Sequence, residues 1–326
     1  MDNELSDRIF LVEQDNFEAL ALETFSFQYA QNEVYRNYVK KLGITPREVD
    51  SVLKIPFLPI GLFKSQVIKT SDFVEELIFQ SSGTTGTVNS RHFIKDARLY
   101  KKSFLEGFRK FYGPPEQWCF VGLLPSYLER KDSSLIFMVD ELIRMSGHSQ
   151  SNFYLYDLEN LAIALHDLEN ANQKTLLIGV TYALLEFAEK FPMPLHHTTV
   201  METGGMKGRR RELTRIEVHN ILMKQFGLLS IHSEYGMTEL LSQAYSSHDG
   251  KFQHVPWMQV FIRNEDDPLE VSPKGTGIVN IIDLANLYSC SFIATDDVGI
   301  VFDDGTFEIL GRADGSDLRG CNLLVI

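Results

Sequence analysis

The chain has 326 residues, of which 44% are hydrophobic and 23% are charged, a globular balance that provides a sizeable core and excludes wholesale disorder. The 31 Lys and Arg residues against 44 Asp and Glu residues give a net charge of −13, which disfavours general nucleic-acid binding. Cys119, Cys290 and Cys321 lack Cys-x-x-Cys spacing, which argues against a disulfide framework and a zinc site. The chain shows no signal-peptide pattern and no apolar run of about 18 residues, so we expect a cytoplasmic protein without a membrane span.

Hydrophobic periodicity predicts a helix over residues 16–42, an irregular Pro- and Gly-punctuated stretch over 56–64, and a short apolar run at 77–80 that leads into a glycine loop. Helices then alternate with short apolar runs. We predict helices over 97–112, 133–145, 158–168, 182–191 and 212–226, and strands over 118–124, 153–156, 175–180, 198–202 and 228–232. Strands separated by such helices indicate crossover connections and an α/β fold with a mainly parallel sheet.

From residue 243 onward the pattern changes to short strands and turns, with strands predicted over 260–263, 277–283 and 306–310. This part is expected to form a smaller β-rich subdomain. Because no Pro- or Ser-rich linker separates the two parts, we place one boundary between an α/β lobe of residues 1–243 and a β-rich subdomain of residues 244–326.

The sharpest motif is a hydroxyl-rich glycine loop. Its residues are Ser81, Ser82, Gly83, Thr84, Thr85 and Gly86. The glycines permit positive φ angles and close approach of the backbone, and the four hydroxyl groups add uncharged donors. This chemistry suits an anion with several oxygens, such as a nucleotide polyphosphate. The Gly-Lys-[Ser/Thr] of a Walker A loop is missing, and a polar surface turn is the alternative for such a hexamer taken alone.

The loop resembles the phosphate loop of the adenylate-forming superfamily, which includes acyl-CoA synthetases, luciferases and amino-acid adenylation domains. The superfamily's usual Pro-Lys continuation is replaced here by Thr87-Val88-Asn89. Four later segments resemble its other signatures in the same order: Glu202-Thr203-Gly204-Gly205, Tyr235-Gly236-Met237-Thr238-Glu239, Thr295-Asp296 and Gly311-Arg312-Ala313-Asp314. The resemblance implies the fold of that superfamily's N-terminal domain. Since only twelve residues follow Asp314 (326 − 314 = 12), we expect the C-terminal lid and its lysine to be absent.

The resemblance also implies ATP and Mg²⁺ as cofactors and assigns roles to the matching residues. Ser81 to Gly86 would hold phosphates, Thr238 would bond the α-phosphate, and Glu239 would hold Mg²⁺. Gly204 and Gly205 would line the acyl and adenine pocket, and Tyr235 and Gly236 would contact adenine. Asp296 would bond the ribose, and Arg312 would belong to the hinge. Taken singly, Tyr235 could be a core aromatic residue, Glu239 a first-turn helix carboxylate, and Asp296 and Asp297 turn residues.

The chain as a whole resembles the acyl-protein synthetases of bacterial bioluminescence operons. The passages at 124–130, 232–239 and 314–322 carry this resemblance. It implies that a fatty acid is activated with ATP as an acyl-adenylate, transferred to the enzyme's own cysteine and passed to a reductase partner. Cys321 would be that acceptor, activated by Arg319 and Gly320 beside it. The alternative for Cys321 is a small buried hydrophobic residue near the chain end.

Two other functions remain open. One is an adenylating ligase that uses an external thiol, such as coenzyme A or a carrier protein, and the other is a non-catalytic nucleotide-binding module. The basic residues of 206–215 are interpreted as a solvated loop and first helical turn, with docking of an acidic partner as the alternative. His232 is interpreted as structural, with contact to the acyl-adenylate as the alternative, and His196-His197 is rejected as a zinc site. Cys119 and Cys290 are predicted to be buried packing residues.

Overall fold

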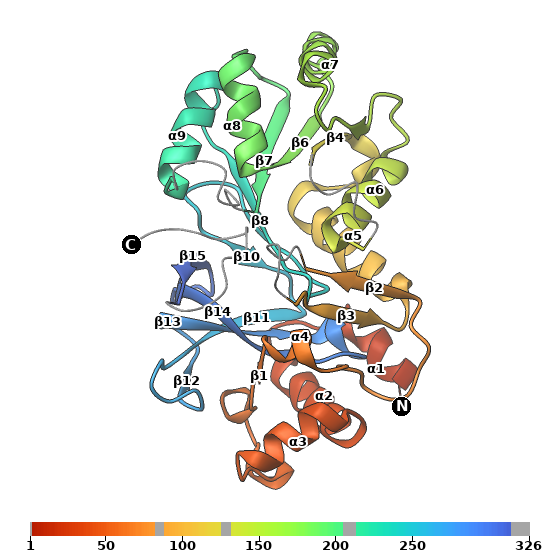
Figure 1. Cartoon of the computed structure of the whole chain (residues 1–326), viewed down its shortest axis with the longest axis vertical. Coiled ribbons are helices and arrows are strands. Elements are labelled where there is room, and N and C mark those ends of the chain that lie inside the picture. Colours follow the sequence, from red (N-terminus) through yellow and green to blue (C-terminus); the bar gives the residue numbers. More distant parts are fainter. Residues whose placement is uncertain (1, 82–87, 125–131, 205–212, 314–326) are drawn as a thin grey trace. The chain divides into compact units, whose positions relative to one another are not determined.

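The computed structural model describes residues 2–81, 88–124, 132–204 and 213–313 (Figure 1). These residues form two compact units. Unit 1 contains the described residues of 2–104, 236–243 and 253–313, and unit 2 contains those of 105–235 and 244–252. The chain therefore passes between the units several times. The sequence pattern predicted a single boundary after residue 243, and the other passages were not anticipated.

Unit 1 is built on a mainly antiparallel sheet with the strand order β1-β14-β13-β11-β12, in which β15 also pairs with β14. Its strands are β1 (Leu58–Pro59), β11 (Met258–Arg263), β12 (Val271–Ser272), β13 (Gly275–Asp283), β14 (Phe292–Val301) and β15 (Phe307–Arg312). The strands predicted over 260–263, 277–283 and 306–310 are thus confirmed. The irregular stretch expected over 56–64 is wrong in part, because it contains β1, which pairs parallel to β14 with Leu58 opposite Ile293.

The helical part of unit 1 comes mostly from the N-terminal region. Its helices are α1 (Asp2–Ile9), α2 (Phe17–Gln31), α3 (Glu33–Lys41) and the one-turn α4 (Leu62–Ser65), with 3₁₀ turns η1 (Pro46–Glu48), η2 (Val52–Lys54) and η4 (Leu284–Asn286). The single helix expected over 16–42 is wrong, because the extended backbone of Asn32 separates α2 from α3. The Asn32 side chain accepts a hydrogen bond from the Tyr35 N–H and donates one to the Ser289 carbonyl oxygen, so a helix cap also joins distant segments.

Unit 1 also contains a hairpin that flanks the glycine loop. Its strands are β2 (Leu77–Gln80) and β3 (Arg91–Ile94), with Gln80 opposite Arg91 and Phe79 opposite His92. The predicted apolar run at 77–80 is therefore a strand. Helix α5 (Ala97–Tyr112) follows the hairpin, as predicted, and β10 (Gln253–His254) is a further short strand of the unit.

Unit 2 has the strand order β9-β8-β7-β6-β4-β5, in which β5, β4, β6, β7 and β8 run parallel and β9 is antiparallel to β8. The strands are β4 (Cys119–Leu123), β5 (Asn152–Phe153), β6 (Thr175–Val180), β7 (Thr198–Thr203), β8 (His232–Tyr235) and β9 (Ala244–Ser246), and the helices are α6 (Ser134–Ser146), α7 (Leu158–Asn170), α8 (Thr181–Lys190) and α9 (Arg215–Phe226), with the 3₁₀ turn η3 (Pro115–Gln117). The predicted α/β alternation and mainly parallel sheet are confirmed. The strand predicted over 228–232 is wrong, because β8 begins at His232.

Local sequence explains why unit 2 folds in this way. Strands β4 and β6 are continuous apolar runs buried along their whole length, as parallel strands covered on both faces require. Helices α8 and α9 lie side by side, and α8 packs against β6 and β7 (Figure 1). Helix α9 begins with a capping box formed by Thr214 and Glu217 and ends at Gly227, whose φ of 65° closes the helix. No helix among the described residues is long and apolar enough to cross a membrane.

Candidate functional site

The stem of the glycine loop is fixed at the point where the described chain enters and leaves the loop. The Ser81 N–H donates to the Ser90 carbonyl oxygen at 3.1 Å, and the Ser81 hydroxyl accepts from the Ser90 N–H at 2.9 Å. Ser81 is only 8% exposed. The remaining predicted loop residues, Ser82, Gly83, Thr84, Thr85 and Gly86, lie outside the described residues.

Thr238 and Glu239 lie in a turn after β8, within the part of the chain that belongs to unit 1. The Leu240 N–H donates to the Met237 carbonyl oxygen at 3.1 Å and closes this turn. Glu239 is fully buried. The alternative interpretation of Glu239 as a first-turn helix carboxylate is therefore wrong, since no helix begins there.

Buried side chains from three other elements of unit 1 hold this turn. His92 of β3 places its Nδ1 atom 2.8 Å from the Thr238 carbonyl oxygen. Asn286 of η4 donates from Nδ2 to the Glu239 carbonyl oxygen at 2.7 Å. The Asp283 carboxylate accepts from the Leu241 and Ser242 N–H groups at 2.8 and 3.0 Å. We call these three side chains the turn clamp. Since each partner lies far away in the sequence, motif analysis alone could not have found them.

The charge states of the turn clamp follow from its burial. Desolvation lowers the pKa of His92 to about 4, against smaller opposing effects of the Thr238 carbonyl oxygen and Glu239, so the imidazole is neutral at pH 7. A carbonyl oxygen can only accept, so Nδ1 carries the hydrogen. Desolvation also raises the pKa of Asp283 to about 6, although four hydrogen bonds favour its charged form.

Asp296 lies on β14 beside the hinge motif. The Ala313 N–H donates to the Asp296 carbonyl oxygen at 3.0 Å, and Asp297 pairs in register with Arg312. Asp296 is partly exposed, whereas Asp297 is 1% exposed. The alternative that these aspartates are turn residues is therefore wrong, because both occupy a strand. Arg312, predicted as a nucleotide-binding residue, places its Nε atom 3.3 Å from Oδ1 of Asp297.

Arg263 of β11 supports the strand segment that carries Asp296. Its Nη2 atom donates to the Thr295 carbonyl oxygen at 2.7 Å, and its Nη1 atom donates to Oδ1 of Asn280 at 2.8 Å. Burial lowers the pKa of Arg263, and the charge of Asp296 opposes this effect. The sequence predicted that Arg263 lies in a strand but did not indicate that it supports the segment carrying Asp296.

Two predicted site residues lie in unit 2, each at the carboxyl end of a strand. Gly204 follows β7 with a φ of 74°, a conformation that favours glycine, and Tyr235 ends β8. Thr203 and Glu234 pair directly across these two parallel strands. Gly204 and Tyr235, which follow them, therefore occupy neighbouring positions at the carboxyl edge of the sheet, where α/β folds bind ligands. The Tyr235 ring is 2% exposed, and its centroid lies 5.8 Å from that of Phe252. Gly205 lies outside the described residues.

A polar cluster that the sequence did not reveal forms around Glu202 of β7, with partners from α8 and α9. The Glu202 carboxylate lies 3.0 Å from the Thr181 hydroxyl oxygen, 3.6 Å from Nε of Arg215 and 3.7 Å from Nε2 of His219. Burial pushes the pKa of Glu202 upward, but His219 and Arg215 outweigh it and the net pKa is lowered. The Thr181 hydroxyl also contacts the Gly204 carbonyl oxygen, which links this cluster to the Gly204 turn.

Glu234 has the opposite electrostatic environment. Its carboxylate accepts from the Thr203 hydroxyl at 2.5 Å. Burial and the neighbouring Glu202 charge raise its pKa to about 7, despite the Thr203 hydrogen bond. His232, two residues earlier, lies with Nδ1 3.1 Å from the Tyr112 hydroxyl oxygen, and burial lowers its pKa to about 4. This contact supports the structural interpretation of His232.

The remaining candidates are placed as follows. Cys119 and Cys290 are both fully buried, which confirms their prediction as packing residues, and burial raises the pKa of Cys290 to about 12. Cys321, Arg319 and Gly320 lie outside the described residues, as do residues 206–212 of the basic segment. The backbone N–H groups of His196 and His197 donate to the Glu169 carboxylate.

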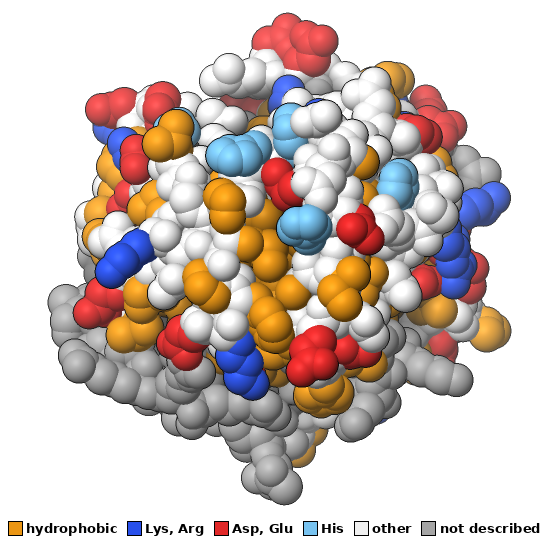
Figure 2. All heavy atoms as spheres, turned by 90° about the horizontal axis from the view of Figure 1, so that it is seen from above, with side chains coloured by type: hydrophobic (Ala, Val, Ile, Leu, Met, Phe, Trp, Pro, Cys, Tyr) orange, Lys and Arg blue, Asp and Glu red, His pale blue; other side chains and the backbone are white. Residues whose placement is uncertain are grey.

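Within the described ranges, no group of three or more His, Cys, Asp or Glu side chains is arranged to hold a metal ion. Figure 2 shows histidine side chains on one face of the molecule, interspersed with apolar and acidic ones. Mg²⁺ differs from metals held in protein cages, because it usually binds through one or two carboxylates together with phosphate oxygens and water. A cluster of protein ligands is therefore not required for Glu239 to hold Mg²⁺, a role that stays a prediction.

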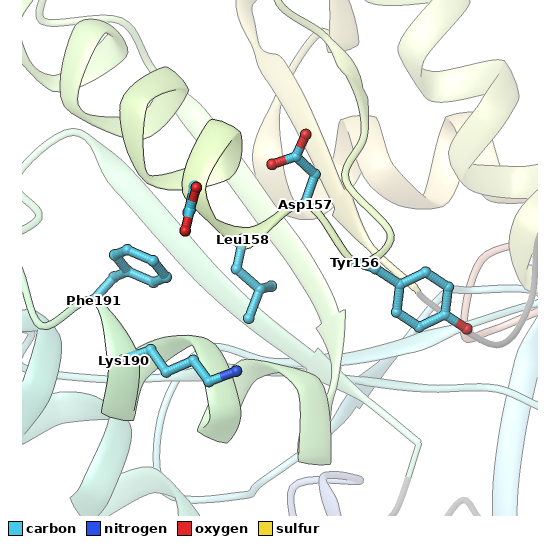
Figure 3. Close-up of a pocket in the computed structure, with 6 residues that line it drawn as sticks. Tyr156, Asp157, Leu158, Lys190 and Phe191 are labelled. Carbon is cyan, nitrogen blue, oxygen red and sulfur yellow. The ribbon is translucent and has the colours of Figure 1, made fainter.

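Unit 2 also has an open pocket of about 510 Å³ (Figure 3). It is lined by Tyr156, Asp157, Leu158, Glu159, Lys190 and Phe191, around the start of α7 and the end of α8. The Lys190 ammonium group forms an ion pair with Glu186 at 2.7 Å. None of these lining residues belongs to a motif that the sequence singled out.

Comparison with known proteins gives matches along nearly the whole chain. The family model described as "Acyl-protein synthetase, LuxE" matches residues 11–326. A long-chain-fatty-acid–luciferin-component ligase of Aliivibrio fischeri is 23% identical and is covered over 93% of its length by 98% of this chain. A ligase of the same name from Vibrio harveyi is 24% identical, with 92% of this chain and 84% of that protein covered.

Solved structures share the fold. An ATP-bound RpMatB-BxBclM chimera has a TM-score of 0.53 at 16% identity, with 74% of this chain and 49% of that chain covered. O-succinylbenzoate coenzyme A synthetase from Bacillus subtilis, in complex with AMP, has a TM-score of 0.50 at 14% identity, with 72% of this chain and 49% of that chain covered. The chain thus spans about half the length of these structures. These likenesses confirm the predicted adenylate-forming fold.

Proposed function

Because the chain belongs to the acyl-protein synthetase (LuxE) family, we propose that it adenylates a long-chain fatty acid with ATP and Mg²⁺ and then carries the acyl group on Cys321. The enzyme is a ligase that uses ATP to activate an acyl group. The fatty acid as substrate, the cysteine acceptor and a protein that receives the acyl group next belong to the proposal. The names of the two relatives support a fatty acid as the substrate.

The first step needs positioning and charge stabilisation. A carboxylate oxygen of the fatty acid attacks the α-phosphorus of ATP, the bond to the bridging oxygen breaks, and pyrophosphate leaves with the electron pair. Thr238 would donate to the α-phosphate, and Asp296 would accept from the ribose hydroxyl groups. Mg²⁺ bound at Glu239 would offset the phosphate charge. The described part of the chain supplies rigid support for these roles through the turn clamp and Arg263.

The second step transfers the acyl group. The Cys321 sulfur would attack the acyl carbonyl carbon, AMP would leave with the electrons of the anhydride bond, and the thiol proton would pass to a base or to water. The two other cysteines are poor candidates for this role, because both are fully buried and burial raises the pKa of each thiol.

One observation carries the adenylation proposal. The turn that bears Thr238 and Glu239 is hydrogen-bonded, through His92, to the hairpin that flanks the hydroxyl-rich glycine loop. The hairpin that leads into the glycine loop and the Thr238–Glu239 turn therefore lie next to each other within one compact unit, which supports the proposal that both motifs bind one nucleotide. A third motif, Thr295-Asp296, lies in the same unit.

The test is exchange of radiolabelled pyrophosphate into ATP in the presence of fatty acids of graded chain length. Wild type should catalyse exchange that depends on both the acid and Mg²⁺. Glu239→Gln and Asp296→Ala should each reduce the rate by about 10²-fold, comparable with the loss of one preorganised group that stabilises developing charge. Glu48→Gln is a suitable control, because Glu48 only caps the exposed η1 turn. Failure of wild type to exchange with any acid would support the non-catalytic alternative and refute the proposal.

A further inference from the structure

His92 is a buried residue that joins the Thr238–Glu239 turn to the hairpin that flanks the glycine loop. It is the second residue of β3 and lies directly across the hairpin from Phe79. Its ring packs edge-on against Phe63 at a centroid distance of 5.9 Å, and the side chain is 1% exposed. It belongs to none of the motifs that the sequence singled out.

The hydrogen bond of His92 has a single direction. The imidazole is neutral, and Nδ1–H donates to the Thr238 carbonyl oxygen at 2.8 Å. Nε2 is then an acceptor, and among the described residues it has no hydrogen-bond partner. Burying Nε2 without a hydrogen-bond partner costs desolvation free energy. If His92 served only for packing, an apolar residue would fill the same space without that cost.

The contact also limits where Glu239 can lie. The Thr238 carbonyl group belongs to the peptide unit that leads into Glu239, so a hydrogen bond to this oxygen restricts the backbone from which the carboxylate projects. The Glu239 charge is close enough to influence the titration of His92. Asn286 holds the next carbonyl group along the chain, so both peptide units around Glu239 are bonded to buried side chains.

We propose that His92 is a positioning residue for adenylation, which holds the Thr238–Glu239 turn against the phosphate-loop hairpin so that Glu239 can bind the Mg²⁺ of the nucleotide. This inference rests on the proposed function. It assigns His92 no contact with the reacting atoms. It predicts that loss of the Nδ1 hydrogen bond weakens the use of Mg²⁺ more than it slows turnover at saturating Mg²⁺.

The experiment compares three substitutions of His92. His92→Asn keeps a donor at about the place of Nδ1, His92→Gln moves the donor toward the place of Nε2, and His92→Leu removes both. Pyrophosphate exchange is measured across a range of Mg²⁺ concentrations. In His92→Leu the KM for Mg²⁺ should rise by about tenfold or more, as expected for one lost buried hydrogen bond. His92→Asn should restore most of this loss, and His92→Gln should not.

A second readout needs no turnover. Calorimetry should measure binding of a non-hydrolysable ATP analogue with and without Mg²⁺. In wild type and His92→Asn, Mg²⁺ should strengthen binding, and in His92→Leu this gain should shrink by a similar factor. The control is His254→Asn, because Nδ1 of His254 lies 3.0 Å from the carbonyl oxygen of its own neighbour Val255 and does not contact the turn. This control should behave as wild type.

The outcomes separate this inference from the proposed function. If wild type exchanges pyrophosphate but His92→Leu has an unchanged KM for Mg²⁺, the positioning role is wrong and adenylation stands. If His92→Gln restores Mg²⁺ use and His92→Asn does not, the Nδ1 contact is not the cause and the inference is also overturned. If no acid supports exchange in wild type, the proposed function fails, and the calorimetric comparison still decides whether His92 supports Mg²⁺-dependent nucleotide binding.

Discussion

Arg312 lies directly opposite Asp297 in the register of β14 and β15, and its Nε atom is 3.3 Å from Oδ1 of that carboxylate. The arginine side chain is 9% exposed and the aspartate side chain 2% exposed, so the charge pair lies inside unit 1. The adjacent Asp296 is partly exposed. The ion pair therefore fixes the strand that presents the proposed ribose-binding carboxylate.

Arg312→Ala should strongly destabilise the protein, because it leaves the Asp297 charge buried without this arginine. We expect the free energy of unfolding to fall by about 3–5 kcal/mol, measured from urea titrations. The control is Arg98→Ala, which removes an arginine that is 87% exposed and paired with Asp96, and it should cost at most about 1 kcal/mol. Equal effects of the two substitutions would contradict the structural role of the Arg312–Asp297 pair.

Glu234→Gln should change how stability depends on pH. The pKa of Glu234 is raised to about 7 in the folded protein from an ordinary value of 4.5, so the folded state favours the protonated carboxyl group. Wild type should therefore lose stability as pH rises from about 4.5 to 7, by an upper bound of about 3 kcal/mol. The glutamine variant lacks this loss and can keep the Thr203 hydrogen bond. Urea titrations at pH 5 and pH 8 measure the difference.

Glu202→Gln, on the neighbouring strand, should change the pH dependence of stability in the opposite direction. The net pKa of Glu202 is lowered, so its charged form stabilises the folded state above the ordinary pKa, and that contribution is lost as pH falls. Glu202→Gln should therefore be less stable than wild type at neutral pH. A parallel response of both glutamine variants to pH would show that the two carboxylates do not have the separate environments described here.

Asp283→Asn should destabilise the turn that carries Glu239. Oδ2 of Asp283 accepts from two backbone N–H groups, and Oδ1 accepts from the Ser242 hydroxyl and the Ala285 N–H. The amide of the Asp283→Asn variant would have only one oxygen, so its NH₂ group would replace the other and face N–H or O–H donors instead of accepting from them. We expect a loss of about 1–3 kcal/mol in urea unfolding, together with slower pyrophosphate exchange. Asp50→Asn, at an exposed ion pair with Lys54, should change neither measurement appreciably.

Cys321→Ser should separate activation from acyl transfer. If Cys321 is the acceptor, the serine variant should retain acid-dependent pyrophosphate exchange and lose covalent labelling by a radiolabelled fatty acid after incubation with ATP and Mg²⁺. Cys119→Ser and Cys290→Ser serve as controls, with stability measured alongside because both positions are fully buried. Labelling of Cys321→Ser at the wild-type level would eliminate this acceptor. Product formation that requires added coenzyme A would favour the external-thiol alternative.

The parallel sheet of unit 2 was predictable because its pattern is local. Strands β4 and β6 are uninterrupted apolar runs, and helix α9 carries a capping box and a terminal glycine that can be recognised in the sequence. Strand β8 was misplaced because it contains His232 and Glu234, so the apolar residues just before it gave the stronger signal. Its polar residues are paired inside the fold, which hydrophobic periodicity does not detect.

The site was predictable to the extent that its residues stand next to one another in the chain. The motifs at Tyr235–Glu239, Thr295-Asp296 and the hinge could be found by their order. The supporting residues could not, because His92, Asp283 and Arg263 reach their partners across large sequence separations. The break of the helical pattern at Asn32 has the same origin, since that side chain bonds the carbonyl oxygen of Ser289, which is 257 positions away along the chain.

The pairing of Leu58 with Ile293 has a consequence for how the protein is made. These partners are 235 positions apart (293 − 58 = 235), so the edge strand β1 cannot dock until the ribosome has synthesised most of the chain. Loop closure of that span is entropically expensive and should make completion of this sheet a slow, late event in folding. The edge of β14 that β1 covers would therefore stay unpaired until late in synthesis, when an exposed strand edge is prone to aggregation.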